Sequence, residues 1–138
     1  MEIPVKDKSS YLKGLLIVAK KDKQLADSEK RIIRSIAEKL GFAPDFYEDV
    51  LKDLLSNDYI IEDPIKFSNI KIAKSFIDDG LRLAYSDNKV SDVEMKWLVE
   101  TSKHNNIEEE WLNEKIELYK NSSVSFSISD FALYSILG

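Results

Sequence analysis

The chain repeats itself at a distance of 65 residues, and this internal repeat constrains the fold more than any other feature of the sequence. At this offset Leu16 aligns with Leu81, and Asp22 aligns with Asp87. Other aligned pairs are Ala19 with Ala84, Asp27 with Asp92, Glu29 with Glu94, Tyr11 with Phe76, Leu12 with Ile77, Ile33 with Leu98, Phe46 with Trp111 and Leu51 with Ile116. Self-similarity at a fixed offset indicates two copies of one supersecondary unit.

Apolar residues in the first copy recur at three- and four-residue spacing, which predicts three helices. The first would begin after Ser9 or Ser10 and end near Lys21, the second would cover 27–40, and the third would start at Pro44. Gly41 would end the second helix, because glycine adopts the left-handed conformation without strain. The predicted inward residues are Tyr11, Leu12, Leu15, Leu16, Ala19, Ile32, Ile33, Ile36, Ala37, Leu40, Phe46, Tyr47, Val50, Leu51, Leu54 and Leu55.

The second copy predicts helices over 68–86, over 92–104 and over 108–120. Ser91 and Glu94 have the spacing of a capping box, in which each side chain satisfies a free backbone donor at the helix start. Asn105 and Asn106 would end the middle helix, since asparagine also tolerates a left-handed turn. The predicted inward residues are Ala73, Phe76, Ile77, Leu81, Ala84, Trp97 and Trp111.

These patterns predict an all-α fold in one domain spanning residues 1–138. With 43% hydrophobic residues, 33% charged residues and only four glycines, the composition suits a compact helical protein. Neither copy could bury its apolar face alone. We therefore expect two tandem three-helix repeats, at about 10–56 and 68–120, packed with pseudo-twofold symmetry, and a C-terminal tail, 121–138, that caps them.

The tail and one helix face suggest a partner-binding surface. Apolar and serine residues alternate over 124–129, and a short helix is predicted over 130–137. Met95 and Val99 stand where the first copy has Lys30 and Arg34. Two interpretations are open: the tail covers this apolar stripe, or the stripe and the tail aromatics bind a partner protein. The residues of the second interpretation are Met95, Val99, Phe126, Phe131 and Tyr134.

Charge and composition exclude several classes of protein. The net charge is −5 and the basic residues are scattered, so we expect no nucleic-acid partner. The longest apolar run, 15–19, is far shorter than the roughly 20 residues of a transmembrane helix, and the N-terminus lacks a signal-peptide pattern. With no cysteine to form disulfides, the sequence predicts a soluble cytoplasmic protein.

The sequence also lacks the residue patterns that enzymes use. His104 is the only histidine and no glycine-rich phosphate loop is present. The paired acids Asp78 and Asp79, and the run 108–110, are interpreted as solvated or helix-start acids. We therefore predict a protein without catalytic activity, although carboxylate pairs can in principle perform acid–base chemistry.

Two repeated turns carry a resemblance to a known family. The segment AKKDKQLADSE at 19–29 and the segment AYSDNKVSDVE at 84–94 each place an Ala, an Asp, an apolar residue and a Glu at the same intervals. This spacing, continued by the run IIRSIAEKLG at 32–41, resembles the TerB-like family of tellurite-resistance proteins and the related N-terminal region of DjlA-type co-chaperones. The resemblance covers most of residues 10–120.

The resemblance implies a helical scaffold that works in stress-response complexes, recruits other proteins and lies at the inner membrane surface. It also implies divalent-metal binding by the acidic turns, with Ca²⁺ or Mg²⁺ as the suitable ions. The ligands carried over by position are Asp22, Asp27, Glu29, Asp87, Asn88, Asp92 and Glu94. Lys23 and Asn88 replace the family's glycine, and acids in a first helical turn also serve as caps. Whether the acidic turns bind Ca²⁺ or Mg²⁺ or serve as helix caps, the sequence predicts no required cofactor.

Overall fold

The computed structural model describes residues 2–20, 27–56, 63–85, 92–121 and 132–133. Within these ranges the protein is all-helical and contains no strand. The helices are α1 (Val5–Lys20), α2 (Asp27–Lys39), α3 (Pro44–Ser56), α4 (Ile70–Tyr85), α5 (Asp92–His104) and α6 (Glu109–Lys120). The all-α prediction is therefore confirmed for the described part of the chain.

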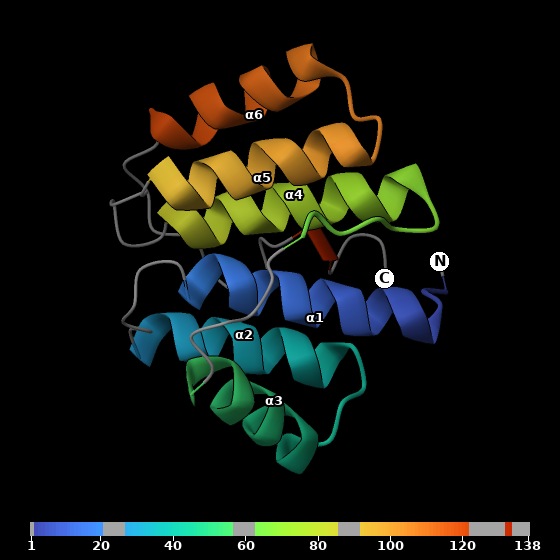
Figure 1. Ribbon diagram of the computed structural model, residues 1–138, viewed down its shortest axis with the longest axis vertical. Helices are drawn as coiled ribbons and strands as arrows, with labels where there is room; N and C mark the ends of the chain where they lie inside the picture. The colour runs from blue at the N-terminus through green and yellow to red at the C-terminus, as the bar shows by residue number, and fades with distance from the viewer. Residues whose placement is uncertain (1, 21–26, 57–62, 86–91, 122–131, 134–138) are drawn as a thin grey trace.

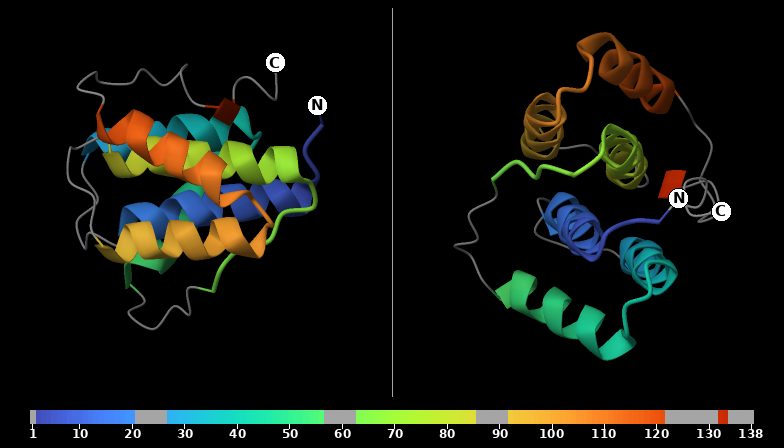
Figure 2. Two further views of the ribbon diagram at one scale, coloured as in Figure 1. Left: turned by 90° about the horizontal axis from the view of Figure 1, so that it is seen from above. Right: turned by 90° about the vertical axis from the view of Figure 1, so that its right-hand side faces the viewer.

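The helices α1 and α4 lie side by side at the centre of the molecule (Figure 1). They run in the same direction, because Asp7 contacts Ser68 near their starts and Val18 approaches Gly80 further along. The helices α2 and α3 pack on one side of this pair, and α5 and α6 pack on the other (Figure 2). The central pair therefore joins the two ends of the molecule.

The core is formed mainly by the inner faces of α1 and α4. Every inward residue predicted for these two helices is buried. The buried set includes Tyr11, Leu12, Leu15, Leu16, Ala19, Ala73, Phe76, Ile77, Leu81 and Ala84. Burial of a large apolar side chain stabilises the fold by about 1.5–3 kcal/mol, so this face supplies much of the driving force for folding.

The ends of α2 and α5 have the same geometry. Gly41 and Asn106 both adopt a positive φ, 92° and 58° respectively. The amide of the next residue then bonds back to the helix, from Phe42 to the Ala37 carbonyl and from Ile107 to the Ser102 carbonyl. This bond pattern satisfies carbonyls that a helix end leaves free, and it confirms the predicted terminators.

Two predictions about burial and helix bounds were wrong. Phe46 was predicted to face inward, but it lies on the outer surface with 47% of its area exposed. Trp111, also predicted to face inward, is partly buried and packs against the core. The first helix starts at Val5, where Pro4 accepts a hydrogen bond from Lys8, and not at Ser9 or Ser10. Its first turn consists of the exposed Val5 followed by the charged residues Lys6, Asp7 and Lys8, so apolar spacing could not reveal it.

Two buried polar side chains, Asn105 and Asp7, form hydrogen bonds with the residues that lead into α4. The Asn105 amide donates to the Ile65 and Thr101 carbonyls at 2.6 and 2.8 Å and accepts from the Phe67 amide at 2.8 Å. Asp7, in the first turn of α1, accepts from the Ser68 amide at 3.1 Å and from its hydroxyl. These contacts set where α4 begins relative to α1.

Candidate functional site

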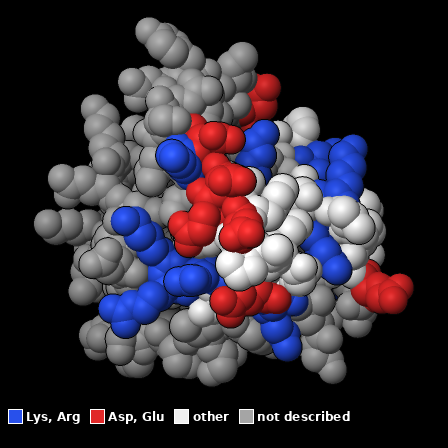
Figure 3. All heavy atoms as spheres, turned by 90° about the horizontal axis from the view of Figure 1, so that it is seen from below, with Lys and Arg blue, Asp and Glu red and all other residues white. Residues whose placement is uncertain are grey.

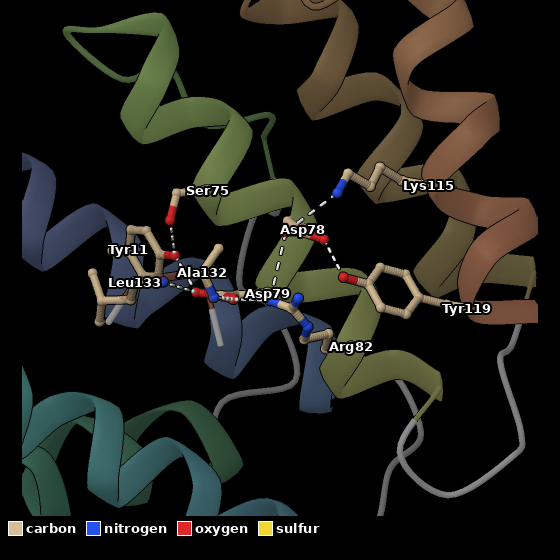
Figure 4. Close-up of polar contacts among 9 residues, drawn as sticks. All are labelled: Tyr11, Ser75, Asp78, Asp79, Arg82, Lys115, Tyr119, Ala132 and Leu133. Carbon is tan, nitrogen blue, oxygen red and sulfur yellow. Dashed lines mark hydrogen bonds and ion pairs between the residues drawn. The ribbon is translucent and has the colours of Figure 1, made fainter. Parts of the chain in front are cut away.

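A cluster of ionisable side chains surrounds Asp78 and Asp79 on α4 (Figure 4). Both residues are buried, and Asp79 is completely inaccessible to solvent. The prediction that these acids are solvated was therefore wrong. Consecutive residues point in directions about 100° apart on a helix, so both can be buried only where the helix is covered on two sides. Here α1 covers one side of α4 and α6 covers another.

Asp79 accepts hydrogen bonds from three different elements. The Tyr11 hydroxyl of α1 donates to Oδ2, and the Leu133 amide donates to the same oxygen at 3.0 Å. The Ala132 amide donates to Oδ1, and Arg82 Nη1 lies 3.3 Å from that oxygen. One carboxylate thus joins α1, α4 and the C-terminal segment. Two consecutive backbone donors are an arrangement that stabilises a carboxylate at a helix start.

Asp78 faces the other side of α4 and contacts α6. The Tyr119 hydroxyl donates to Oδ1, while Oδ2 lies 3.5 Å from Arg82 Nη1 and 3.8 Å from Lys115 Nζ. The Arg82 guanidinium also lies over the Tyr119 ring, 5.4 Å from its centroid. Arg82 therefore stands between both acids.

Burial is the main influence on ionisation in this cluster. Desolvation raises the pKa of Asp79 to about 7, against hydrogen bonds from Tyr11 and the two backbone amides, which favour the ionised form. Desolvation, followed by the nearby Asp79 charge, raises the pKa of the Tyr11 hydroxyl well above its ordinary value. Desolvation also raises the pKa of Tyr119, and its hydrogen bond to Asp78 adds to this shift. Both phenols therefore act as donors at neutral pH.

The cluster belongs to the second half of the chain alone. The position 65 residues before Asp79 is Gly14, and the partner of Gly14 across the central pair is Phe76. A Cβ atom at Gly14 would collide with the Phe76 ring, whereas the corresponding ring of Tyr11 carries a hydroxyl that needs an acceptor. The sequence does carry a signal of this difference. The contact between Phe76 and Gly14 has as its aligned counterpart the contact between Tyr11 and Asp79, so both partners change together.

Most of the predicted metal ligands lie outside the described part of the chain. Asp22, Asp87 and Asn88 fall in segments that are not described, and of Asp27 and Glu29 only the helical backbone is described. Asp92 is exposed at the start of α5, and Glu94 is buried with 2% of its area accessible. Within the described ranges no group of three or more His, Cys, Asp or Glu side chains could hold a metal ion.

The predicted partner-binding residues are divided in the same way. Met95 and Val99 are partly buried and pack against the core. Phe126, Phe131 and Tyr134 lie outside the described residues, as does the segment 124–129 that was expected to be extended. His104 is exposed at the end of α5. The two interpretations of the apolar stripe on α5 both stay predictions.

Within the described residues, the cluster around Asp79 joins separate elements of the fold. Its carboxylate is fully buried, and its two oxygens face a phenol, a guanidinium and two backbone amides. Acid–base catalysis requires a titratable group within hydrogen-bond reach of a substrate proton. The arrangement is therefore suited to fixing the C-terminal segment on α4.

No model of a protein family, no curated protein and no solved structure matches the chain. None of the described helices combines the length and the apolar character needed to cross a membrane. Function is therefore inferred from the contacts within the chain itself.

Proposed function

We propose that the protein is a non-catalytic helical module that acts by binding other proteins. The observation that carries this proposal is the engagement of Asp78 and Asp79. This acidic pair, a natural candidate for acid–base chemistry, is committed to contacts between α1, α4, α6 and the C-terminal segment. The outer surface of the described helices instead presents large apolar side chains, among them Phe46, Val93 and Leu118. Aromatic side chains such as Phe46 are enriched where proteins contact one another.

The helix bounds support an architecture of two tandem three-helix repeats related by pseudo-twofold symmetry. Corresponding helices begin 65 residues apart, at Val5 and Ile70, at Asp27 and Asp92, and at Pro44 and Glu109. The positive-φ residues that follow α2 and α5 have the same separation. Equal spacing of helix starts and stops is expected of a duplicated unit that kept its local turn chemistry. The backbone amides of Ala132 and Leu133 then bond to Asp79, an acceptor that the second half alone carries.

A TerB-like affiliation would place this module in a stress-response or envelope-associated system at the cytoplasmic side of the inner membrane. The repeated segments 19–29 and 84–94 support it, because each spans the passage from a central helix to the next helix of its half. Fold and function are separable, however, and a scaffold of this kind does not itself specify a partner. The partner has to be found by experiment.

The proposal is tested by proximity labelling in cells with the labelling enzyme fused to the full chain. The control is the same fusion carrying Leu81→Asp, since a charge at this fully buried position should abolish folding. We expect a reproducible set of proteins labelled by the folded chain and lost with the control. Equal labelling by both fusions, or no labelled protein in replicate experiments, would overturn the proposal.

A further inference from the structure

The outer face of α3 carries an aromatic pair that faces solvent. Phe46 is 47% exposed and stacks on Phe42 with ring centroids 5.1 Å apart and planes inclined by 22°. Stacking of this kind favours the arrangement of the two rings beyond the burial of their area. The pair offers an exposed aromatic surface on α3.

Acidic side chains border this ring. Asp45, Glu48 and Asp49 are all exposed on α3, and none of them forms an ion pair with another residue of the described ranges. Asp49 is three residues from Phe46 and therefore lies beside it on the helix surface. Figure 3 views the molecule from the α3 side and shows acids gathered in a band across the middle of this face, with basic side chains on its flanks.

The second half of the molecule shows how an aromatic residue at this position can be covered. Trp111 stands on α6 where α3 has Phe46, and the ammonium groups of Lys74 and Lys115 lie 5.5 and 5.7 Å from its ring centroid. The positions aligned with these lysines are Ser9 and Val50, neither of which carries a charge. The first half therefore has no lysine at the two positions that supply the cations over Trp111.

We propose that the α3 face formed by Phe42, Asp45, Phe46, Glu48 and Asp49 binds a lysine- or arginine-rich segment of a partner protein. This inference rests on the proposed interaction function and specifies the chemistry of the partner. A cationic side chain would lie over the Phe46 ring, as Lys74 and Lys115 lie over Trp111. The carboxylates beside the ring would pair with neighbouring cations of the same segment. The acidic band selects against anionic partners.

The test measures binding of a fluorescent peptide rich in lysine and arginine to the full chain, with a glutamate-substituted peptide as the negative probe. The variants are Asp45→Asn/Asp49→Asn and, separately, Phe46→Ser, each checked for folding by circular dichroism. The matched control is Glu110→Gln/Glu114→Gln, which removes the same charge from the aligned positions of α6. Each α3 variant should weaken binding about tenfold, and the α6 control by less than twofold.

Several results would overturn the inference. Equal weakening by the α3 and α6 charge variants would mean that binding follows net charge alone. Equal binding of the glutamate peptide, or no saturable binding of the basic peptide, would also contradict it. If the chain self-associates and Phe46→Ser abolishes this in sedimentation measurements, the face is an interface between two copies instead. If proximity labelling finds the same partner proteins with the wild-type chain and with the α3 variants, this inference is refuted but the proposed interaction function stands.

Discussion

Tyr11 and Phe76 occupy aligned positions in the two halves and differ by a single hydroxyl group. The Phe76 ring rests against Gly14, where no side chain intervenes, while the Tyr11 hydroxyl meets the Asp79 carboxylate. A buried hydroxyl needs a partner, because leaving it unsatisfied costs about 1–3 kcal/mol. The hydroxyl and the acid are therefore interdependent, and together they supply the acceptor that the C-terminal segment uses.

Removing the hydroxyl should destabilise the protein although the ring is retained. In Tyr11→Phe the buried Asp79 carboxylate loses one of its donors, and we expect a loss of about 1–3 kcal/mol in the free energy of unfolding. Urea denaturation measures this loss. Tyr47→Phe is the matched control, because its hydroxyl donates to the Lys30 carbonyl at 3.2 Å in a part-buried position. Equal losses of unfolding free energy for both variants would show that the Tyr11–Asp79 hydrogen bond stabilises the fold no more than the part-buried Tyr47 bond does.

Asp79 should make stability depend on pH in an identifiable direction. Its pKa is raised from the ordinary value of 3.8 to about 7 by burial, so the folded chain binds this proton more tightly than the unfolded chain. The stabilisation is complete below about pH 4 and is lost as pH rises through 7, with a total on the order of 4 kcal/mol. The measurement is urea unfolding of wild type and Asp79→Asn between pH 4 and 8. A difference between the two proteins that stays constant over this range would contradict the prediction.

At the scale of helices, the sequence contained most of the information that the fold required. The predicted ends of α2 and α5 and the start of α3 agree with the structure, because Gly41, Pro44 and Asn106 act through local backbone chemistry. The start of α1 and the cluster around Asp79 could not be predicted in this way. They depend on contacts with residues more than 50 positions away, such as Asp7 with Ser68 and Asp79 with Leu133.

The left-handed residues that end α2 and α5 should respond differently to substitution. Gly41→Ala places a Cβ atom at a φ of 92° and should cost about 1 kcal/mol or more. Asn106→Gly relieves a φ of 58° and should be close to neutral in comparison. Thermal unfolding of both variants provides the measurement. A neutral Gly41→Ala would mean that the turn can change its conformation without loss.

The acidic turns before α2 and α5 are expected to act as helix caps, and a titration with ions can decide the matter. We expect the melting temperature of the chelator-treated protein to stay constant on addition of Ca²⁺ or Mg²⁺. An ion at a hundred times its dissociation constant would add about 2.7 kcal/mol, which is several degrees for a domain of this size. A saturable shift that Asp87→Asn/Asp92→Asn abolishes would instead establish the metal site.

At the scale of the whole molecule, the C-terminal segment makes the two halves unequal. Leu133 is completely buried, and its amide bonds to Asp79 beside the central pair. The segment therefore contributes both apolar burial and hydrogen bonds to one side of α4. Its hydrogen bonds go to the second half, because the aligned residue in the first half is Gly14, which offers no acceptor side chain.

Ending the chain after Asn121 should therefore destabilise the whole fold. The loss of the buried Leu133 side chain and of two donors to Asp79 should lower the free energy of unfolding by about 2–4 kcal/mol. Leu133→Ala keeps both backbone donors and should give a smaller loss. Chemical denaturation of the two proteins separates the apolar part from the polar part. A truncated chain as stable as the full one would show that the segment is dispensable.

The central position of the α1–α4 pair also has a consequence for synthesis of the chain on the ribosome. The inner face of α1, with Leu12, Leu15 and Leu16, is completed by a helix that begins 65 residues later. At a synthesis rate of about 5–20 residues per second, the start of α4 follows the start of α1 after roughly 3–13 s. During this interval α2 and α3 can already pack on α1, but the part of its apolar face that contacts α4 has no partner helix. The order of synthesis thus leaves one side of the first half uncovered until α4 emerges.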